Sequence, residues 1–259
     1  MTPSDSYLLE IIEKYKAHDI LAYEIYSIPE LKSRIKTWAN TCFIEIINSG
    51  SRAKGTAISL ASDVDYLVSL TNDCPETLQD IYNSLYNELK VHYPTARKQN
   101  VSVRIKVSTL EIDITPAKKL SGNTNNHNLY VSKLSTWKQT NIQKHINDIS
   151  QSGRLNEIKI LKIWRELHRL DFPSIYLEYL LNDIILLGKS KGNDYLANNA
   201  WYVINQLAKD TVNPLFSRVV DPANSANILS DLLSVAEKNK IVAEAKISAS
   251  QVNWGTIVW

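Results

Sequence analysis

The chain has 259 residues and a nearly balanced charge, with 29 Lys and Arg against 27 Asp and Glu, for a formal net charge of +2. Hydrophobic residues make up 44% and charged residues 22%, which excludes a disordered or fibrous chain and fits one large domain or two small ones. The small net charge excludes a protein that wraps nucleic acid by bulk electrostatics, so any nucleic-acid contact must be a local patch.

The two cysteines, Cys42 and Cys74, lie far apart and lack the spacing of a metal-binding pair. We therefore expect neither a disulfide scaffold nor a zinc ribbon, no disulfide-linked partner, and a reducing environment. No apolar run is long enough to span a bilayer, and the N-terminal residues are acidic where a signal peptide is basic and then apolar. The sequence predicts a cytoplasmic protein without membrane contact.

The first part of the chain combines helical and strand periodicity. Residues 5–47 have the 3.6-residue apolar spacing of helices, with a second helical stretch over Pro29–Ile47. The period changes at Asp63-Val64-Asp65-Tyr66-Leu67-Val68, which predicts a strand, and residues 77–91 return to helix. Val101–Val107 and Leu110–Ile114 alternate strictly, and the two residues between them predict a tight hairpin.

From about residue 137 to 245 the pattern is helical almost throughout, and Ala226–Ala245 is the last main candidate helix. We therefore predict an α+β fold in two domains. Residues 1–135 form the catalytic domain, a mixed sheet with flanking helices, and residues 136–259 form an all-helical domain. A ligand site is expected in the cleft between two such lobes.

Three aspartates carry the strongest chemical signal. Asp63 and Asp65 are two residues apart in the predicted strand, so they project from the same side. Asp113 projects opposite Ile112 and Ile114 on the hairpin strand. If the strands are adjacent, three carboxylates share one sheet face, a hard oxygen site suited to Mg²⁺ and to in-line displacement at phosphorus.

A Gly50-Ser51 turn lies just upstream of these aspartates. Gly50 permits close approach of the backbone to a ligand, and Ser51 can begin a short helix whose N–H groups favour phosphate oxygens. Arg52 and Lys54 follow on this helix, and we expect them to be solvated, with a role in binding polyphosphate or a nucleic-acid end as the alternative. A Gly-Ser turn or an Asp-x-Asp strand alone is usually structural, and the combination indicates a functional site.

The order of these motifs resembles the nucleotidyltransferases of the DNA polymerase β superfamily. The resemblance rests on Gly50-Ser51-x₃-Gly55-Thr56, Asp63-x-Asp65 and the Asp113-Ile-Thr-Pro-Ala run. In the helical part, Leu161-Lys162-Ile-Trp164 followed by Ser174-Ile-Tyr-Leu-Glu178 resembles a block of the oligoadenylate synthases and of the bacterial cGAS/DncV-like nucleotidyltransferases (CD-NTases). The Asp221-Pro222 segment with Asn227 is similar to a segment of the same group and of archaeal CCA-adding enzymes.

The resemblance implies transfer of a nucleotidyl group from an NTP, ATP among them, with release of pyrophosphate. Asp63, Asp65 and Asp113 would bind two Mg²⁺ ions, or Mn²⁺ in their place, and Asp113 would help to deprotonate the attacking hydroxyl. Gly50 and Ser51 would hold the β- and γ-phosphates, and Lys162 and Ser174 would reach the same phosphates from the helical domain.

Two products fit this chemistry. The first is a short cyclic or linear oligonucleotide signal, as CD-NTases make in antiviral defence. The alternative is addition of nucleotides to a macromolecule, such as a tRNA 3′ end or a protein hydroxyl. The basic residues on or near the hairpin, including Arg104, could guide an RNA end or an acceptor nucleotide, although solvated sheet-edge cations are commoner. A catalytically inactive binding module is disfavoured, because all three aspartates are present.

Overall fold

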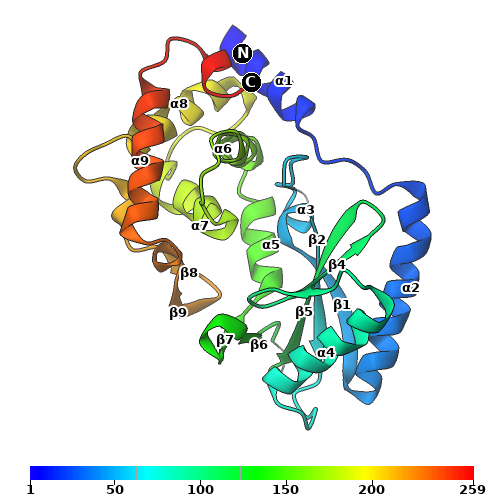
Figure 1. Ribbon diagram of the computed structural model, residues 1–259. Helices are drawn as coiled ribbons and strands as arrows, with labels where there is room; N and C mark the ends of the chain where they lie inside the picture. The colour runs from blue at the N-terminus through cyan, green and yellow to red at the C-terminus, as the bar shows by residue number, and fades with distance from the viewer. Residues whose placement is uncertain (62, 123) are drawn as a thin grey trace. The chain divides into compact units, whose positions relative to one another are not determined.

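The computed structural model describes residues 1–61, 63–122 and 124–259, with the side chains of all of these except residues 22 and 23. The chain forms two compact units (Figure 1). The sheet unit comprises His18–Lys54 and Asp63–Ile146, and the helical unit comprises Met1–Ala17, Gly55–Ser62 and Asn147–Trp259. The predicted boundary divides the chain once, after residue 135, whereas these units assign two earlier segments to the helical part.

A seven-stranded mixed sheet forms the centre of the sheet unit. Its order is β1-β2-β5-β4-β3, and β6 pairs with β5 and β7. Strands β2 and β5 are parallel, and the other pairs are antiparallel. The strands are β1 (Phe43–Ser49), β2 (Val64–Leu70), β3 (Arg97–Lys98), β4 (Val103–Val107), β5 (Leu110–Lys119), β6 (His127–Val131) and β7 (Thr136–Thr140). The helices are α2 (Ala22–Ala39), α3 (Gly50–Lys54), α4 (Leu78–His92) and the first part of α5 (Ile142–Ser150).

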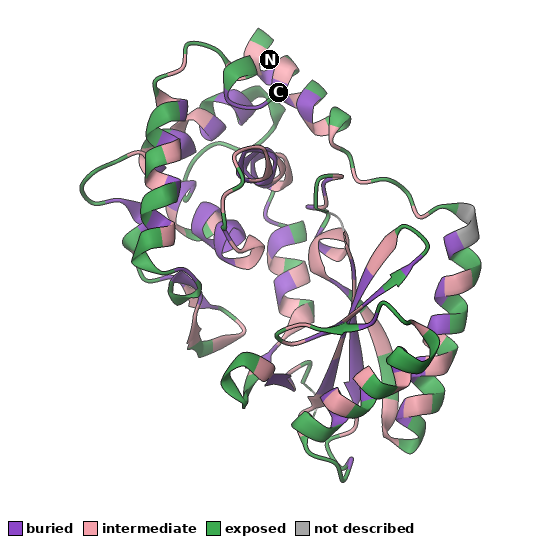
Figure 2. Cartoon of the chain, in the orientation of Figure 1, coloured by how far each residue is buried: buried purple, intermediate pink, exposed green. Residues whose placement is uncertain are grey.

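Alternation along the central strands separates the two faces of this sheet. Val64, Tyr66 and Val68 of β2 are buried in one core cluster with apolar residues of α2 and α4. Figure 2 shows buried positions along the central strands and on the inner sides of these helices. Because side chains alternate along a strand, the residues between them, Asp65 among them, belong to the opposite face. The predicted mixed sheet with flanking helices is confirmed.

The hairpin prediction is confirmed, and one helix prediction is wrong. Strands β4 and β5 pair from Val107 and Leu110 onward, and Ser108 in the turn takes a left-handed φ of 56°. Residues 43–47, predicted as the end of a helix, belong to strand β1, which pairs antiparallel with β2. The segment is rich in Phe and Ile, which favour a strand, and the pairing partner decides the outcome.

The expectation about the cysteines is also corrected, because a disulfide joins Cys42 to Cys74. Cys42 directly precedes β1, and Cys74 lies a few residues after β2. These strands are antiparallel, with Phe43 opposite Leu70, so the two cysteines lie at the same end of the pair despite a separation of 32 residues. Antiparallel pairing therefore creates a proximity that the sequence spacing conceals.

The helical unit packs mainly α-helices around one core cluster, which includes Trp164. No helix among the described residues is long and apolar enough to cross a membrane. The α-helices are α1 (Pro3–Lys14), the end of α5, α6 (Leu155–Leu167), α7 (Ser174–Tyr179), α8 (Leu196–Leu207) and α9 (Val235–Ala249). A π-helical segment, Leu180–Ile185, follows α7, and short 3₁₀ turns join several of the other elements.

The prediction of an all-helical part over residues 136–259 needs two corrections. Residues Thr136–Thr140 form strand β7, which pairs with β6 of the sheet. Strands β8 (Val220–Asp221) and β9 (Asn224–Ile228) form a small hairpin, whereas a helix was expected from residue 226. The Asp221 carboxylate accepts a hydrogen bond from the backbone N–H of Ala223 at 2.8 Å. Such an Asx turn competes with helix formation, and α9 begins only at Val235.

Candidate active site

One row of side chains crosses three strands of the sheet unit. Asp65 on β2 is paired in register with Asp113 on β5, and Asp113 is paired with Arg104 on β4. Paired residues of neighbouring strands point to the same face, so these three side chains form a row on the face opposite α2 and α4. Asp63 lies two residues before Asp65 on the same strand path. The strands that carry Asp65 and Asp113 are therefore neighbours, which is the condition for a shared carboxylate face.

Arg104 binds two of the three predicted metal ligands. Its Nε and Nη2 donate to the two carboxylate oxygens of Asp113 at 2.9 and 2.5 Å. Nη2 also donates to Asp63 at 2.5 Å, and Nη1 donates to Glu111 at 2.8 Å. The bond with Asp113 raises the pKa of Arg104 further above its usual range. The interpretation of Arg104 as a solvated sheet-edge cation is therefore wrong, since its side chain is 22% exposed and paired with carboxylates.

The sequence contained a signal for this contact. A two-residue turn at 108–109 places residue 107 opposite 110, and counting back along both strands places Arg104 opposite Asp113. The alternation of the two strands predicts the hairpin, and the length of its turn fixes this pair.

Asp65 has the most perturbed environment of the three aspartates. Burial, followed by the neighbouring charges of Asp113 and Asp63, raises the pKa of Asp65 to about 6. The charge of Lys54 acts in the opposite direction. Lys54 is buried, with 8% of its surface exposed, so the expectation that it is solvated is wrong. Its burial beside the aspartates makes it part of the electrostatics of this face.

Gly50 lies directly against the carboxylate of Asp65. It has a φ of 66°, and a Cβ built at this position would lie 1.7 Å from an Asp65 carboxylate oxygen. Glycine is therefore required both by the backbone conformation and by the space that Asp65 occupies. The predicted short helix begins here as α3, and Ser51 lies in its first turn. The Gly-Ser turn thus lies in direct contact with one of the three aspartates, Asp65.

The donor set suits a hard divalent cation. Asp63, Asp65 and Asp113 supply carboxylate oxygens from neighbouring strands, which is the ligand type that Mg²⁺ prefers. Among the residues that the structure describes, these three carboxylates do not form one close cluster of oxygens. The Arg104 guanidinium instead lies between Asp63 and Asp113.

The other two predicted phosphate-binding residues belong to the helical unit. Lys162 on α6 is 2% exposed, and its Nζ lies 2.7 Å from Glu178 on α7. Nζ also donates to the Thr56 hydroxyl at 2.8 Å, and that hydroxyl donates to the same Glu178 oxygen at 3.0 Å. Thr56, which lies more than 100 positions before Lys162 and Glu178 in the sequence, thus closes a buried polar triangle with them. The role of Lys162 toward phosphate stays a prediction.

Ser174 begins α7, and its hydroxyl accepts a hydrogen bond from Arg165 at 2.9 Å. The same Arg165 nitrogen donates to the backbone oxygen of Phe172 at 2.8 Å, so the guanidinium orients the segment that leads into Ser174. Sequence reasoning missed Arg165, because a charged residue on a helix is usually solvated and only the tertiary packing buries this one.

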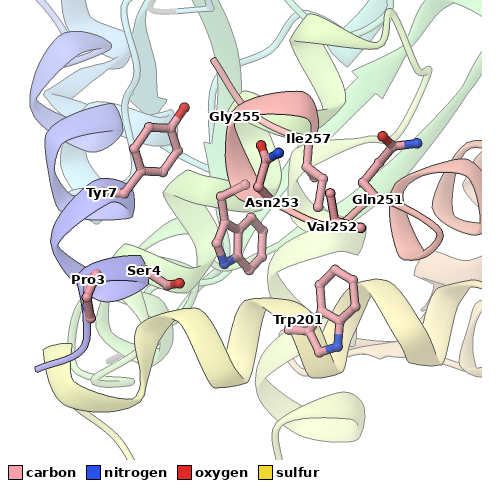
Figure 3. Close-up of a pocket in the computed structure, with 10 residues that line it drawn as sticks. Pro3, Ser4, Tyr7, Trp201, Gln251, Val252, Asn253, Gly255 and Ile257 are labelled. Atoms are coloured by element: carbon pink, nitrogen blue, oxygen red, sulfur yellow. The ribbon is translucent and has the colours of Figure 1, made fainter.

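A separate cavity of about 540 Å³ lies in the helical unit (Figure 3). Tyr7 from α1, Trp201 from α8 and the segment around Asn253 surround it, and it contains none of the predicted site residues. In the sheet unit, a cavity of about 560 Å³ is lined by Asp65 and Arg52 together with apolar residues of α2. Of the three aspartates, Asp65 is the one that lines this cavity.

The sheet unit is a mixed sheet with Asp65 and Asp113 on adjacent strands and Asp63 just before the first of them, and a Gly-Ser turn precedes all three in the chain. This arrangement defines a nucleotidyltransferase fold of the polymerase β type. Residues 22–152, just over half of the chain, match the family model of the Second Messenger Oligonucleotide or Dinucleotide Synthetase domain (SMODS). The chain belongs to this family. The resemblance to the bacterial CD-NTases is thereby confirmed.

Known relatives agree with this assignment. The chain is 24% identical over 155 residues to the cyclic AMP-AMP-AMP synthase of Escherichia coli (strain MS 115-1), an alignment that covers 54% of this chain. It spans about half of that relative, 48% of its length. Two solved structures share the fold: E. coli MS115-1 CdnC in complex with HORMA-deltaN (TM-score 0.73, 18% identity, 95% of this chain and 90% of that one) and the Bradyrhizobium diazoefficiens CD-NTase CdnG in complex with GTP (TM-score 0.74, 10% identity, 96% and 91%).

Proposed function

We propose that this chain is a nucleotidyltransferase that joins NTPs into a short cyclic or linear oligonucleotide signal and releases pyrophosphate. The observation that carries the proposal is the register of Asp65 with Asp113 on adjacent parallel strands, with Gly50 directly against the Asp65 carboxylate. This arrangement places a turn that would bind phosphate next to a carboxylate face within one unit. The relatives support ATP as a substrate, because one of them is named a cyclic AMP-AMP-AMP synthase.

Asp63, Asp65 and Asp113 would hold Mg²⁺, in two sites, with Mn²⁺ as a substitute. The bound cations would neutralise charge on the triphosphate and lower the pKa of a bound hydroxyl. Gly50 and Ser51 would present backbone N–H groups and a hydroxyl to the β- and γ-phosphates. Lys162 and Ser174 would contribute a cation and a hydroxyl to the same phosphates, for which Lys162 would have to exchange its contact with Glu178.

In the proposed reaction, the hydroxyl oxygen of one nucleotide forms a bond to the α-phosphorus of an NTP. The bond from that phosphorus to the bridging oxygen breaks, and pyrophosphate leaves with the bonding pair. The proton of the attacking hydroxyl passes to Asp113. Little covalent work is left to the protein, so its contribution is positioning and stabilisation of negative charge.

The test is an incubation of the purified chain with radiolabelled ATP, GTP, CTP and UTP and Mg²⁺, with and without tRNA. Small labelled products that resist phosphatase would support a cyclic signal, and a phosphatase-sensitive ladder of short oligonucleotides would support a linear one. Label found only in RNA or protein would replace the signal synthase with the macromolecular transferase. No pyrophosphate release from any NTP, alone or with tRNA, would contradict both.

A further inference from the structure

Arg104 is the feature of the carboxylate face that the proposed function does not use. Its guanidinium makes four hydrogen bonds to three carboxylates, those of Asp63, Glu111 and Asp113. We propose that Arg104 is the counter-ion of this face: its guanidinium pairs with Asp63 and Asp113 and competes with a divalent cation for these two carboxylates. This role of Arg104 rests on the metal site of the proposed function.

The geometry of strand β4 sets the direction of the Arg104 side chain, so Arg104 is not a freely moving surface residue. Val103 and Ile105 on either side of it are buried in the core beneath α2 and α4. The alternation of β4 then directs Arg104 to the opposite face, where the register sets Asp113 directly across from it. The backbone of β4 therefore holds a cation over the aspartates whether or not a metal is present.

The contacts of the guanidinium differ in strength. Asp113 receives two parallel bonds, the bidentate geometry in which Arg binds a carboxylate most tightly. Asp63 receives one bond, from the nitrogen Nη2 that Asp113 already shares, and the Asp63 side chain is 35% exposed. The bond to Asp63 is therefore the one that a competing cation breaks first.

Glu111 is a carboxylate partner that the Arg104 guanidinium can keep when a cation displaces it from Asp63. Its carboxylate accepts from Arg104 Nη1 at 2.8 Å and from Arg97 at 2.9 Å, and it lies two residues from Asp113 on the same strand face. Arg104 can thus release Asp63 and keep a carboxylate partner. A divalent cation that takes Asp63 would not leave Arg104 without a counter-charge.

Competition of this kind predicts the direction of a change in metal affinity. Removing the guanidinium removes the competitor, so Mn²⁺ should bind the metal-stripped, nucleotide-free protein more tightly in Arg104→Gln than in the wild type. A charge-assisted hydrogen bond of ordinary strength corresponds to a gain of about tenfold or more. A role in which Arg104 aligns Asp113 for the metal predicts the opposite, a loss of affinity.

The experiment is a titration of the full chain with Mn²⁺, followed by electron paramagnetic resonance and by calorimetry. Arg97→Gln is the matched control, because Arg97 binds Glu111 and has no described bond to an aspartate. We expect tighter binding in Arg104→Gln and unchanged binding in Arg97→Gln. Circular dichroism checks that each variant is folded, and Arg104→Lys, which retains one charge without the bidentate fork, replaces Arg104→Gln if that variant unfolds; it should bind Mn²⁺ more tightly than the wild type.

The possible outcomes separate the counter-ion role of Arg104 from the existence of the metal site. Unchanged or weaker binding in the folded Arg104 variant, with normal binding in the wild type, overturns the counter-ion and leaves the metal site standing. An absence of Mn²⁺ binding in every protein overturns both the metal site and the counter-ion. An equal gain in Arg97→Gln would assign the effect to net charge and would also overturn the inference.

Discussion

The Nζ of Lys162 lies 2.7 Å from a carboxylate oxygen of Glu178, with both side chains almost fully buried in the helical unit. Thr56 joins the pair through its hydroxyl and is itself buried. The Gly55–Ser62 segment that carries Thr56 belongs to the helical unit, yet along the chain it joins α3 to β2, both parts of the sheet unit. The Lys162–Glu178 pair thus fixes Thr56 within the helical unit.

Glu178→Gln should destabilise the protein by about 3–5 kcal/mol, because it removes a carboxylate from beside a buried ammonium. Lys162→Met should cost a similar amount, and the double variant should lose clearly less than the sum of the two. Urea denaturation measures all three, with the partly exposed Lys159→Met on the same helix as the control. An unchanged urea midpoint for Glu178→Gln would show that the pair does not form in solution.

ATP binding by the same variants tests the predicted phosphate contact of Lys162. If Lys162 exchanges Glu178 for a phosphate, Lys162→Met should weaken ATP binding roughly tenfold or more, as expected for the loss of a charge-assisted contact. Glu178→Gln should then bind ATP at least as tightly as the wild type, because Lys162 no longer has to leave a carboxylate. Calorimetric affinities that are equal for wild type and Lys162→Met would restrict Lys162 to the structural role.

The paired substitution Asp63→Asn with Asp65→Asn should lower nucleotidyl transfer by about a thousandfold or more, because it removes two carboxylates from the proposed metal site without changing side-chain volume. Release of labelled pyrophosphate measures the rate. Asp73→Asn, an exposed aspartate after β2 in the same unit, should retain full activity. Substantial turnover by the folded double variant would show that the catalytic site lies elsewhere.

The stability of the metal-free protein should depend on the titration of Asp65. Its pKa of about 6 lies above the usual value of 3.8, so folding favours the protonated carboxyl. The stabilisation from the bound proton is complete below pH 3.8 and is lost as the pH rises through 6, a change of about 3 kcal/mol. Unfolding free energies of wild type and Asp65→Asn, measured in EDTA at about pH 4.5 and about pH 7.5, should therefore diverge at the higher pH, with Asp65→Asn the more stable protein. A constant difference between them would contradict the raised pKa.

Gly50→Ala should disturb the site more than its backbone conformation alone explains. A Cβ there would overlap the Asp65 carboxylate and would also force alanine to a positive φ. Gly188→Ala is the matched control, since Gly188 has a similar φ of 75° and a Cβ added there would meet no atom of the described residues within 4 Å. The control should lose about 1 kcal/mol, and Gly50→Ala should lose about 1–3 kcal/mol more together with its catalytic activity. Equal losses of stability in both variants would show that Asp65 does not contact Gly50.

The sequence by itself predicted the parts of the site that depend on local spacing. The alternation of 101–107 and 110–114 specified the hairpin, Asp63-x-Asp65 specified a shared strand side, and Gly50-Ser51 specified a turn into a short helix. These predictions hold because periodicity and turn chemistry act over a few residues. The same local signals failed at residues 43–47, where the apolar spacing suits a helix or a strand and pairing with β2 decided for the strand.

Only the tertiary structure decided which charged groups meet. The hairpin turn by itself sets Arg104 opposite Asp113, but the contact of Arg104 with Asp63 depends on the pairing of β2 with β5, and Lys54 becomes a buried neighbour of Asp65 only in the folded sheet unit. Lys162 and Thr56 are 106 residues apart, and helix packing alone brings them to Glu178. The physical reason is that a buried charge must find a partner at hydrogen-bond distance, and that partner is chosen by strand register and packing over long separations, which one-dimensional spacing does not encode.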